Sequence, residues 1–174
     1  MAKLGEKLTL IIPCFNEARR LGQFFLGWKS FWNENQYQLL EFFDGVELCF
    51  VDDGSLDTTA IDLRKHMDEL QEVGVHLESY SQNQGKGYAV RHGLNHTKAD
   101  WYLITDLDLS TPLEEMFKLF ESVNLDEHGQ LAFGSRRVAG ARIARSQKGL
   151  RPFLGILFNR FVRMMTGLPF KDTQ

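Results

Sequence analysis

The sequence predicts an α/β fold whose mainly parallel sheet is flanked by helices. Short apolar runs alternate along the chain with amphipathic segments of helix length, and this alternation is typical of βαβ units. Polar motifs follow the ends of four of these runs. The 174 residues, 43% hydrophobic and 25% charged, are enough for one domain with a sizeable core.

Five short apolar runs are predicted to be strands, because turn residues or a proline bound them. The first run stops at Pro13 and the second at Asp52. The five runs are residues 8–12, 46–51, 75–80, 101–105 and 130–134.

The segments between these runs carry apolar residues at helical spacing. In the first segment, one face comprises Leu21, Phe24, Phe25, Trp28, Phe31 and Trp32. A second helix is expected over residues 58–72, and a third runs from the 83–87 loop to about His96. The fourth helix starts with Pro112, which suits a first turn, and reaches about Val123.

Polar motifs follow the carboxyl ends of the first four predicted strands. Ligands of parallel sheets bind outside these ends, so we expect the motifs to converge at one edge. Scattered surface acids would not fall at the same end of four successive strands. The motifs are Asn16-Glu17, Asp52-Asp53, residues 83–86 and residues 106–108.

Asp106 and Asp108 stand one residue apart directly after an apolar run. Mg²⁺ and Mn²⁺ prefer oxygen ligands and often bind through one or two carboxylates plus substrate phosphates. The pair therefore predicts a metal–diphosphate site, with Ser110 as a further or water-mediated ligand. The alternative is a turn with two solvated aspartates. The convergence of four motifs favours the metal site.

Two other motifs offer contacts to a nucleotide. Asp52 and Asp53 open a turn that also suits a helix cap, and a carboxylate there can accept hydrogen bonds from a base N–H or a ribose hydroxyl. Gly85 and Lys86 precede a helix, where backbone N–H groups and a cation attract an anion. The alternative for this second motif is a flexible loop with a helix start.

The net charge of −3 conceals a basic C-terminal segment. Residues 135–171 contain nine Lys and Arg residues and no Asp or Glu. Such a segment implies an anionic partner: phosphate, nucleic acid or a membrane surface. Within it, residues 150–165 interleave arginine with apolar side chains. This pattern fits either a helix in a membrane interface or a core-packing helix with a basic face.

The cysteines, the N-terminus and the histidines limit the kinds of site and location that we expect. Cys14 and Cys49 lie in apolar runs and are expected to be buried, reduced thiols of a reducing compartment. The N-terminus lacks the apolar core of a signal peptide, and no run is long enough to span a membrane. The five histidines are interpreted as surface or core residues without metal-ligand spacing.

Taken together, the motifs resemble family 2 glycosyltransferases, and most closely their dolichyl-phosphate mannose and glucose synthase branch. The resemblance covers essentially the whole chain. It is carried by five motifs in order and by the terminal Asp172-Thr173-Gln174. The five motifs are residues 11–17, 51–55, 83–89 and 105–110, and Gly134-Ser135-Arg136.

The resemblance implies a GT-A fold, Rossmann-like, and a nucleotide-sugar donor such as UDP-glucose or GDP-mannose. It implies that Asp106 and Asp108 flank a Mg²⁺ or Mn²⁺ ion and the diphosphate. Arg136 would meet the acceptor phosphate, with Arg151 as a second contact. Leu107, in the middle of the carboxylate motif, should point away from the metal. The residues that would line the nucleotide pocket are Pro13, Asn16, Glu17, Asp53 and Lys86.

The expected reaction is an inverting hexosyl transfer to a polyprenyl or dolichyl phosphate in cell-envelope glycan synthesis. Residues 129–171 contain no carboxylate that could act as a general base, and a phosphate acceptor, already anionic, needs none. Three alternatives stay open: a polysaccharide or other sugar acceptor, a haloacid-dehalogenase-like phosphatase, and a non-catalytic nucleotide-sugar-binding module. The sequence leaves the oligomeric state open.

We expect a single GT-A domain over residues 1–174. Residues 1–134 would bind the nucleotide sugar, and residues 135–174 would face the acceptor and a membrane. The expected location is the cytoplasmic face of a membrane, peripherally associated, with no nucleic-acid partner. Because the last three residues resemble the start of a longer motif, we expect the chain to be truncated at its C-terminus.

Overall fold

A computed structural model describes residues 3–123, 129–134, 158, 160–162, 164–165 and 167. The chain divides into two compact units, Met1–His128 and Gly129–Gln174. In the described residues of the first unit, eight elements alternate strictly between strand and helix. They are β1 (Gly5–Cys14), α1 (Ala18–Phe42), β2 (Phe43–Asp53), α2 (Thr59–Met67), β3 (Gly74–Tyr80), α3 (Lys86–His96), β4 (Trp101–Ile104) and α4 (Glu115–Glu121).

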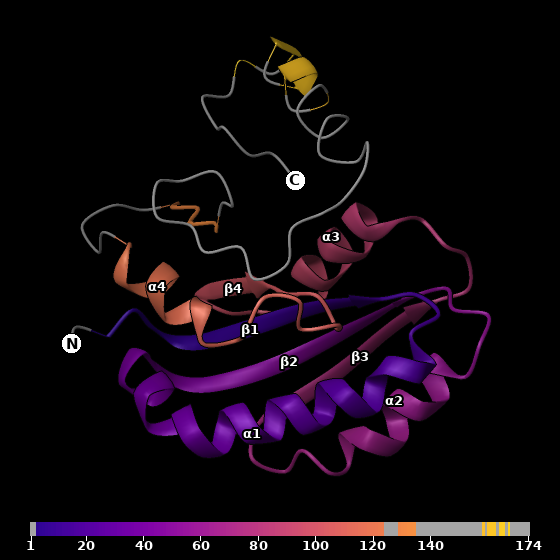
Figure 1. Cartoon of the computed structure of the whole chain (residues 1–174), viewed down its shortest axis with the longest axis horizontal. Helices are drawn as coiled ribbons and strands as arrows, with labels where there is room; N and C mark the ends of the chain where they lie inside the picture. Colours follow the sequence, from indigo (N-terminus) through magenta and orange to yellow (C-terminus); the bar gives the residue numbers. More distant parts are fainter. Residues whose placement is uncertain are drawn as a thin grey trace. The chain divides into compact units, whose positions relative to one another are not determined.

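The four strands form one parallel sheet in the order β3-β2-β1-β4 (Figure 1). Leu10 of β1 lies opposite Leu48 of β2 on one side and Leu103 of β4 on the other. The predicted parallel α/β sheet is therefore confirmed. The chain crosses over β1 between β3 and β4, so the strand order reverses beside β1. Ligands of open α/β sheets bind at such a reversal.

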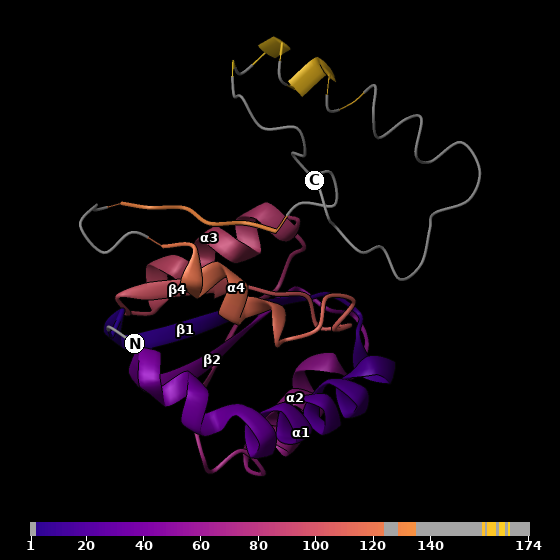
Figure 2. The ribbon, with the colours of Figure 1, turned by 60° about the vertical axis from the view of Figure 1, so that its left-hand side comes forward.

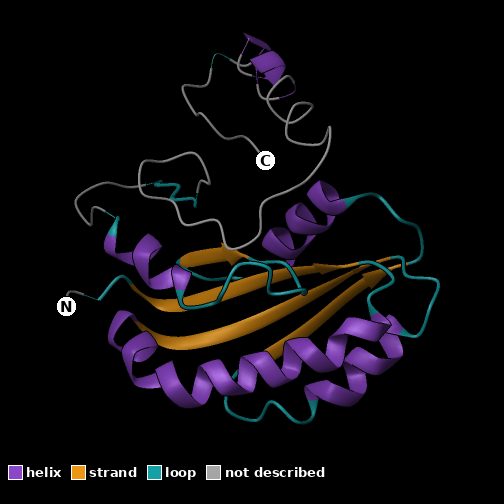
Figure 3. Cartoon of the chain, viewed as in Figure 1, coloured by secondary structure: helices purple, strands orange, loops and turns teal. Residues whose placement is uncertain are grey.

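Helices cover both faces of the sheet. The helices α1 and α2 lie on one face and α3 lies on the other (Figures 2 and 3). Because successive strand residues point to opposite faces, Leu10 and Ile12 join the large core under α1, whereas Ile11 packs in a smaller cluster with Ala89 of α3. Gly93 lets α3 approach closely, since a Cβ there would lie 2.9 Å from Cγ2 of Ile11.

Aromatic packing fixes the position of α1 and α4. Phe24 and Trp28 of α1 are completely buried, which burial of apolar surface strongly favours. Phe117 of α4 stacks on Phe31 at 6.1 Å between ring centroids and also contacts Phe42. The helices α1 and α4 therefore pack against each other in the large core cluster. The polar residues at the carboxyl ends of the strands lie outside this cluster.

Several predicted boundaries differ from the structure. Residues 130–134, expected as a fifth strand, are described without strand structure, so that prediction is wrong. Leu131 in this run is 79% exposed, unlike the buried apolar residues of the sheet strands. The helix expected to reach residue 72 ends at Met67, and β1 continues past Pro13 to Cys14. In the described part of the chain, no helix has the length and apolar character of a membrane span.

Candidate functional site

A pocket of about 410 Å³ opens where the four strands end. Segments that follow each of the four strands contribute to it, as expected at the reversal of strand order. The structure thus brings seven of the predicted site residues together. Those seven are Pro13, Glu17, Asp53, Gly85, Lys86, Asp106 and Asp108.

Asn16 and Asp52, also predicted to contact the nucleotide, do not line this pocket. Asn16 adopts a positive φ of 54°, and its Oδ1 accepts a hydrogen bond from the N–H of Leu56 at 2.8 Å. Its own N–H donates to Oγ of Ser55 at 2.9 Å. Asp52 is buried and accepts from the N–H of Ser55 at 3.3 Å. The Asn16 side chain therefore fastens the loop after β1 to the loop after β2, whereas Asp52 closes the turn within the second loop.

Asp53 organises the loop between β3 and α3. Its carboxylate is 3% exposed and accepts hydrogen bonds on both oxygens. Charge-assisted hydrogen bonds of this kind are the strong ones, so the buried carboxylate is well satisfied and the loop is held at the pocket wall. The donors are Tyr80 Oη (2.8 Å), Gln84 N (2.7 Å), Asn83 Nδ2 (3.0 Å) and Gly85 N (2.9 Å).

Gly54 lets the loops after β2 and β3 touch. Its φ is +68°, and a Cβ there would lie 2.7 Å from the backbone nitrogen of Asn83. A side chain would meet both the strained backbone region and this contact. The glycine of the Asp-Asp-Gly-Ser motif thus serves packing between two pocket loops.

Asp106 and Asp108 both present carboxylates at the pocket. The Lys86 ammonium lies 2.5 Å from Oδ1 of Asp106, and both side chains are more than half exposed. Oδ1 of Asp108 accepts from the N–H of Ser110 at 2.9 Å. The pocket carboxylates already attract one cation, and an all-oxygen donor set fits Mg²⁺ or Mn²⁺.

Leu107 anchors the loop that carries Asp106 and Asp108. Its side chain is 4% exposed and belongs to the large core cluster. Leu109, with a positive φ of 48°, packs against the same cluster. The apolar residues on either side of Asp108 therefore anchor the loop, and the two aspartates remain exposed.

Other pocket residues carried no clear signal in the sequence. Cys14, the last residue of β1, and Phe15, the first residue of the following loop, both line the pocket. Burial, with smaller effects of the Asp52 and Glu17 charges, raises the pKa of the Cys14 thiol far above its usual range. A protonated thiol is a poor nucleophile, so Cys14 serves as part of the pocket wall.

Arg136 and Arg151 lie outside the described residues, and their assignment to the acceptor phosphate stays a prediction.

Comparison with known proteins identifies relatives. The family model described as glycosyl transferase family 2 matches residues 9–171. A dolichyl-phosphate beta-glucosyltransferase of Dictyostelium discoideum is 28% identical over 170 residues, which cover 96% of this chain and 51% of that protein. A bactoprenol glucosyl transferase of Shigella phage SfX is 31% identical over 141 residues, covering 80% and 43%. The chain thus spans about half the length of these curated relatives.

Among solved structures, a mannosyltransferase from Pyrobaculum calidifontis in complex with GDP-Man and Mn²⁺ is similar. It is 26% identical, and the match covers 58% of this chain and 27% of that one with a TM-score of 0.46.

Proposed function

The chain belongs to glycosyl transferase family 2, and on this premise we propose that it transfers a hexose from a nucleotide sugar to a polyprenyl or dolichyl phosphate. Family membership and the parallel sheet agree with the GT-A fold class expected from the motifs. Membership also sets aside the phosphatase alternative. The observation that carries the proposal is the pocket, which gathers Asp106, Asp108 and Lys86 at the reversal of strand order.

The donor diphosphate is assigned to the part of the pocket beside β4. Asp106 and Asp108 would hold a Mg²⁺ or Mn²⁺ ion, and that ion would offset the charge that builds on the diphosphate leaving group. The Lys86 ammonium, paired with Asp106 in the structure, can also donate to phosphate oxygens. Its exposure allows the exchange of one anionic partner for another, because exposed ion pairs are weak.

The nucleoside is assigned to the part of the pocket beside β1 and β2. Pro13 and Phe15 offer apolar surface there, and Glu17 offers a carboxylate. Asp53 already accepts hydrogen bonds from four protein donors. We therefore assign it the role of holding the pocket loop, with any base or ribose contact added to those bonds.

The acceptor is proposed from charge and from the relatives. A lipid phosphate is anionic near neutral pH, so attack by its oxygen requires no general base, in keeping with the absence of carboxylates from residues 129–171. The names of two relatives contain dolichyl phosphate and bactoprenol, and both describe glucosyl transfer. We assign the acceptor phosphate to Arg136 and Arg151, and peripheral membrane association to the basic segment.

The test is transfer of radiolabelled sugar from UDP-glucose or GDP-mannose, with Mg²⁺ or Mn²⁺, to polyprenyl phosphate in detergent. We expect the label in the organic phase, and no label there with the Asp108→Asn variant. Label that appears only in water-soluble oligosaccharide would support the sugar-acceptor alternative. Donor binding without any transfer would support the non-catalytic module.

A further inference from the structure

We propose that Glu78, His92 and His96 form a second metal site, suited to a transition ion such as Zn²⁺, which fastens α3 to β3. One ligand atom from each side chain lies within 4.8 Å of the other two. The site is built from different elements and different chemistry than the pocket carboxylates. The sequence pattern alone indicates no metal-ligand spacing for His92 and His96, and the fold brings both together with Glu78.

The backbone places the three side chains on facing surfaces. His92 and His96 are four residues apart in α3, so they share one face of the helix. Glu78 lies in β3, and its carboxylate approaches His92 across the junction of strand and helix. Paired histidines at this helical spacing are a familiar arrangement for binding zinc.

The hydrogen bond of His96 leaves its other ring nitrogen free for a metal. Nδ1 of His96 lies 2.8 Å from the carbonyl oxygen of His92. A carbonyl only accepts, so Nδ1 carries the hydrogen, and Nε2 of the neutral ring has an unshared electron pair. Metal-binding histidines usually donate their other N–H to a carbonyl or carboxylate in this way.

The spacing of Glu78 and His92 also fits a shared ion. Nε2 of His92 lies 3.4 Å from Oε2 of Glu78, whereas a charge-assisted hydrogen bond is about 2.7–2.9 Å long. In a tetrahedral zinc site with bonds of about 2.0–2.1 Å, neighbouring ligand atoms are roughly 3.4 Å apart. The two atoms therefore have the separation of ligands around a common ion.

The surroundings allow an ion to enter and be retained. The side chains of His92 and Glu78 are 18% and 31% exposed, while His96 lies at the surface. The His92 and His96 rings stack at 3.9 Å between centroids; because the lone pairs of imidazole lie in the ring plane, one ring must rotate out of this stack for both to bind the same ion. Three protein ligands leave a fourth position for water.

The donor atoms of this site differ in kind from those of the pocket. Imidazole nitrogens favour zinc and its neighbours in the transition series, whereas carboxylate oxygens suit Mg²⁺ and Mn²⁺. The helix α3 that carries both histidines begins with Lys86, a pocket residue. An ion between α3 and β3 would therefore steady one wall of the pocket without contacting its carboxylates.

The test is a calorimetric titration of the metal-free chain with Zn²⁺ in a large excess of Mg²⁺, which occupies the carboxylate pair. We expect one equivalent of zinc to bind to the wild type. Affinity should fall at least tenfold in His96→Gln and in Glu78→Gln. It should be unchanged in Asp108→Asn and in His66→Gln, a matched control on α2 whose ring pairs with Glu69.

Side-chain nitrogen NMR provides a second readout that does not depend on the variants. Zinc should shift the ring signals of His92 and His96 and leave those of His66 and His76 in place. The proposal is overturned if the wild type binds no zinc under these conditions. It is equally overturned if His96→Gln, shown to be folded by circular dichroism, binds zinc as the wild type does.

Discussion

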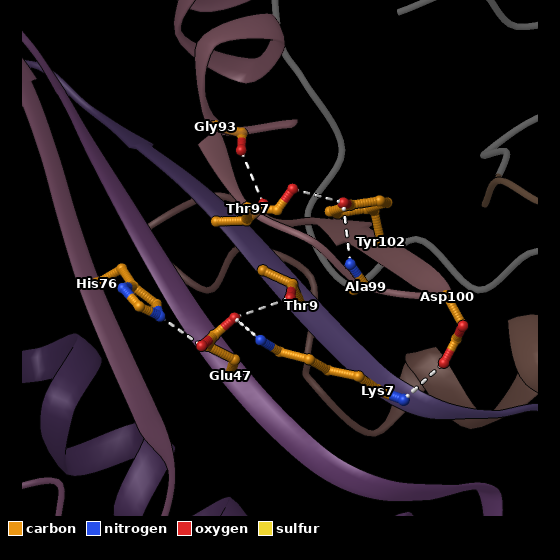
Figure 4. A network of polar contacts seen from close by, with 9 residues as sticks. All are labelled: Lys7, Thr9, Glu47, His76, Gly93, Thr97, Ala99, Asp100 and Tyr102. Carbon is orange, nitrogen blue, oxygen red and sulfur yellow. Dashed lines mark hydrogen bonds and ion pairs between the residues drawn. The ribbon is translucent and has the colours of Figure 1, made fainter. Parts of the chain in front are cut away.

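Two carboxylates of this chain, Glu47 and Asp106, lie in opposite environments. Glu47, in the middle of the sheet, is 7% exposed and fully paired (Figure 4). Lys7 Nζ lies 2.6 Å from its Oε2, Thr9 Oγ1 donates to the same oxygen at 3.2 Å, and His76 contacts Oε1. Asp106, just after β4, is half exposed, and among the described residues its carboxylate pairs with Lys86.

This difference separates a charge that stabilises the fold from a charge that is available to ligands. Burial by itself would raise the pKa of Glu47, but hydrogen bonds from Lys7 and His76 outweigh it and hold the pKa below its usual range. A buried charge with several partners is costly to disturb. An exposed charge with one partner exchanges that partner easily, as a carboxylate that binds a metal and substrate must.

The largest effect is expected for Asp108→Asn. This change removes the carboxylate charge but keeps an oxygen for the N–H of Ser110. We expect sugar transfer to fall about 1000-fold, equivalent to about 4 kcal/mol of transition-state stabilisation. Stability should change by less than about 0.5 kcal/mol, as for other exposed sites. Initial rates and urea unfolding measure both quantities. The control Asp44→Asn, at an exposed aspartate paired with Lys3, should change neither.

The reverse pattern is expected for Glu47→Ala. The change removes the acceptor shared by Lys7 and Thr9; because the Lys7 side chain is 39% exposed and can be hydrated, we expect a cost of about 2 kcal/mol of unfolding free energy. The transfer rate per folded molecule should remain within about threefold of the wild type, because Glu47 does not line the pocket. A rate loss as large as that of Asp108→Asn would contradict the separation of the two roles.

Acid should remove the contribution of Glu47 to stability. Its folded-state pKa is lowered, so its stabilisation is fully present above the unfolded-state pKa of about 4.3 and is lost as the pH falls through the lower folded value. The stability difference between the wild type and Glu47→Gln should therefore be larger at about pH 5 than at about pH 3. Urea unfolding across this range provides the test. A difference that grows on acidification would reverse the assigned sign.

A smaller effect is expected for Tyr80→Phe, which bears on how Asp53 holds the pocket loop. Burial and the hydrogen bond to Asp53 raise the pKa of Tyr80, so the hydroxyl stays protonated and donates to Oδ1. Its loss should cost about 1 kcal/mol of stability. The looser loop should raise the KM for the donor a few-fold with little change in kcat. An unchanged KM would show that the other three donors suffice.

The sequence predicted the architecture well because apolar runs and helical spacing determine it locally. The convergence of polar motifs followed from the parallel sheet. Pairing across strands was not predictable: Glu47 lies within an apolar run, and its partners Lys7 and His76 depend on the strand register. The contact of Glu78 with the α3 histidines also requires the fold. Asn16 and Asp52 do not line the pocket, because their side-chain oxygens accept hydrogen bonds from the backbone of the loop after β2.

Calorimetric titration with UDP-glucose and GDP-mannose, each with and without Mn²⁺, tests the central claim most directly. We expect one donor to bind to the wild type and to Glu47→Gln only when metal is present, and to lose this binding in Asp108→Asn. Metal-independent donor binding that persists in Asp108→Asn would contradict the assignment of the exposed carboxylates to the donor diphosphate.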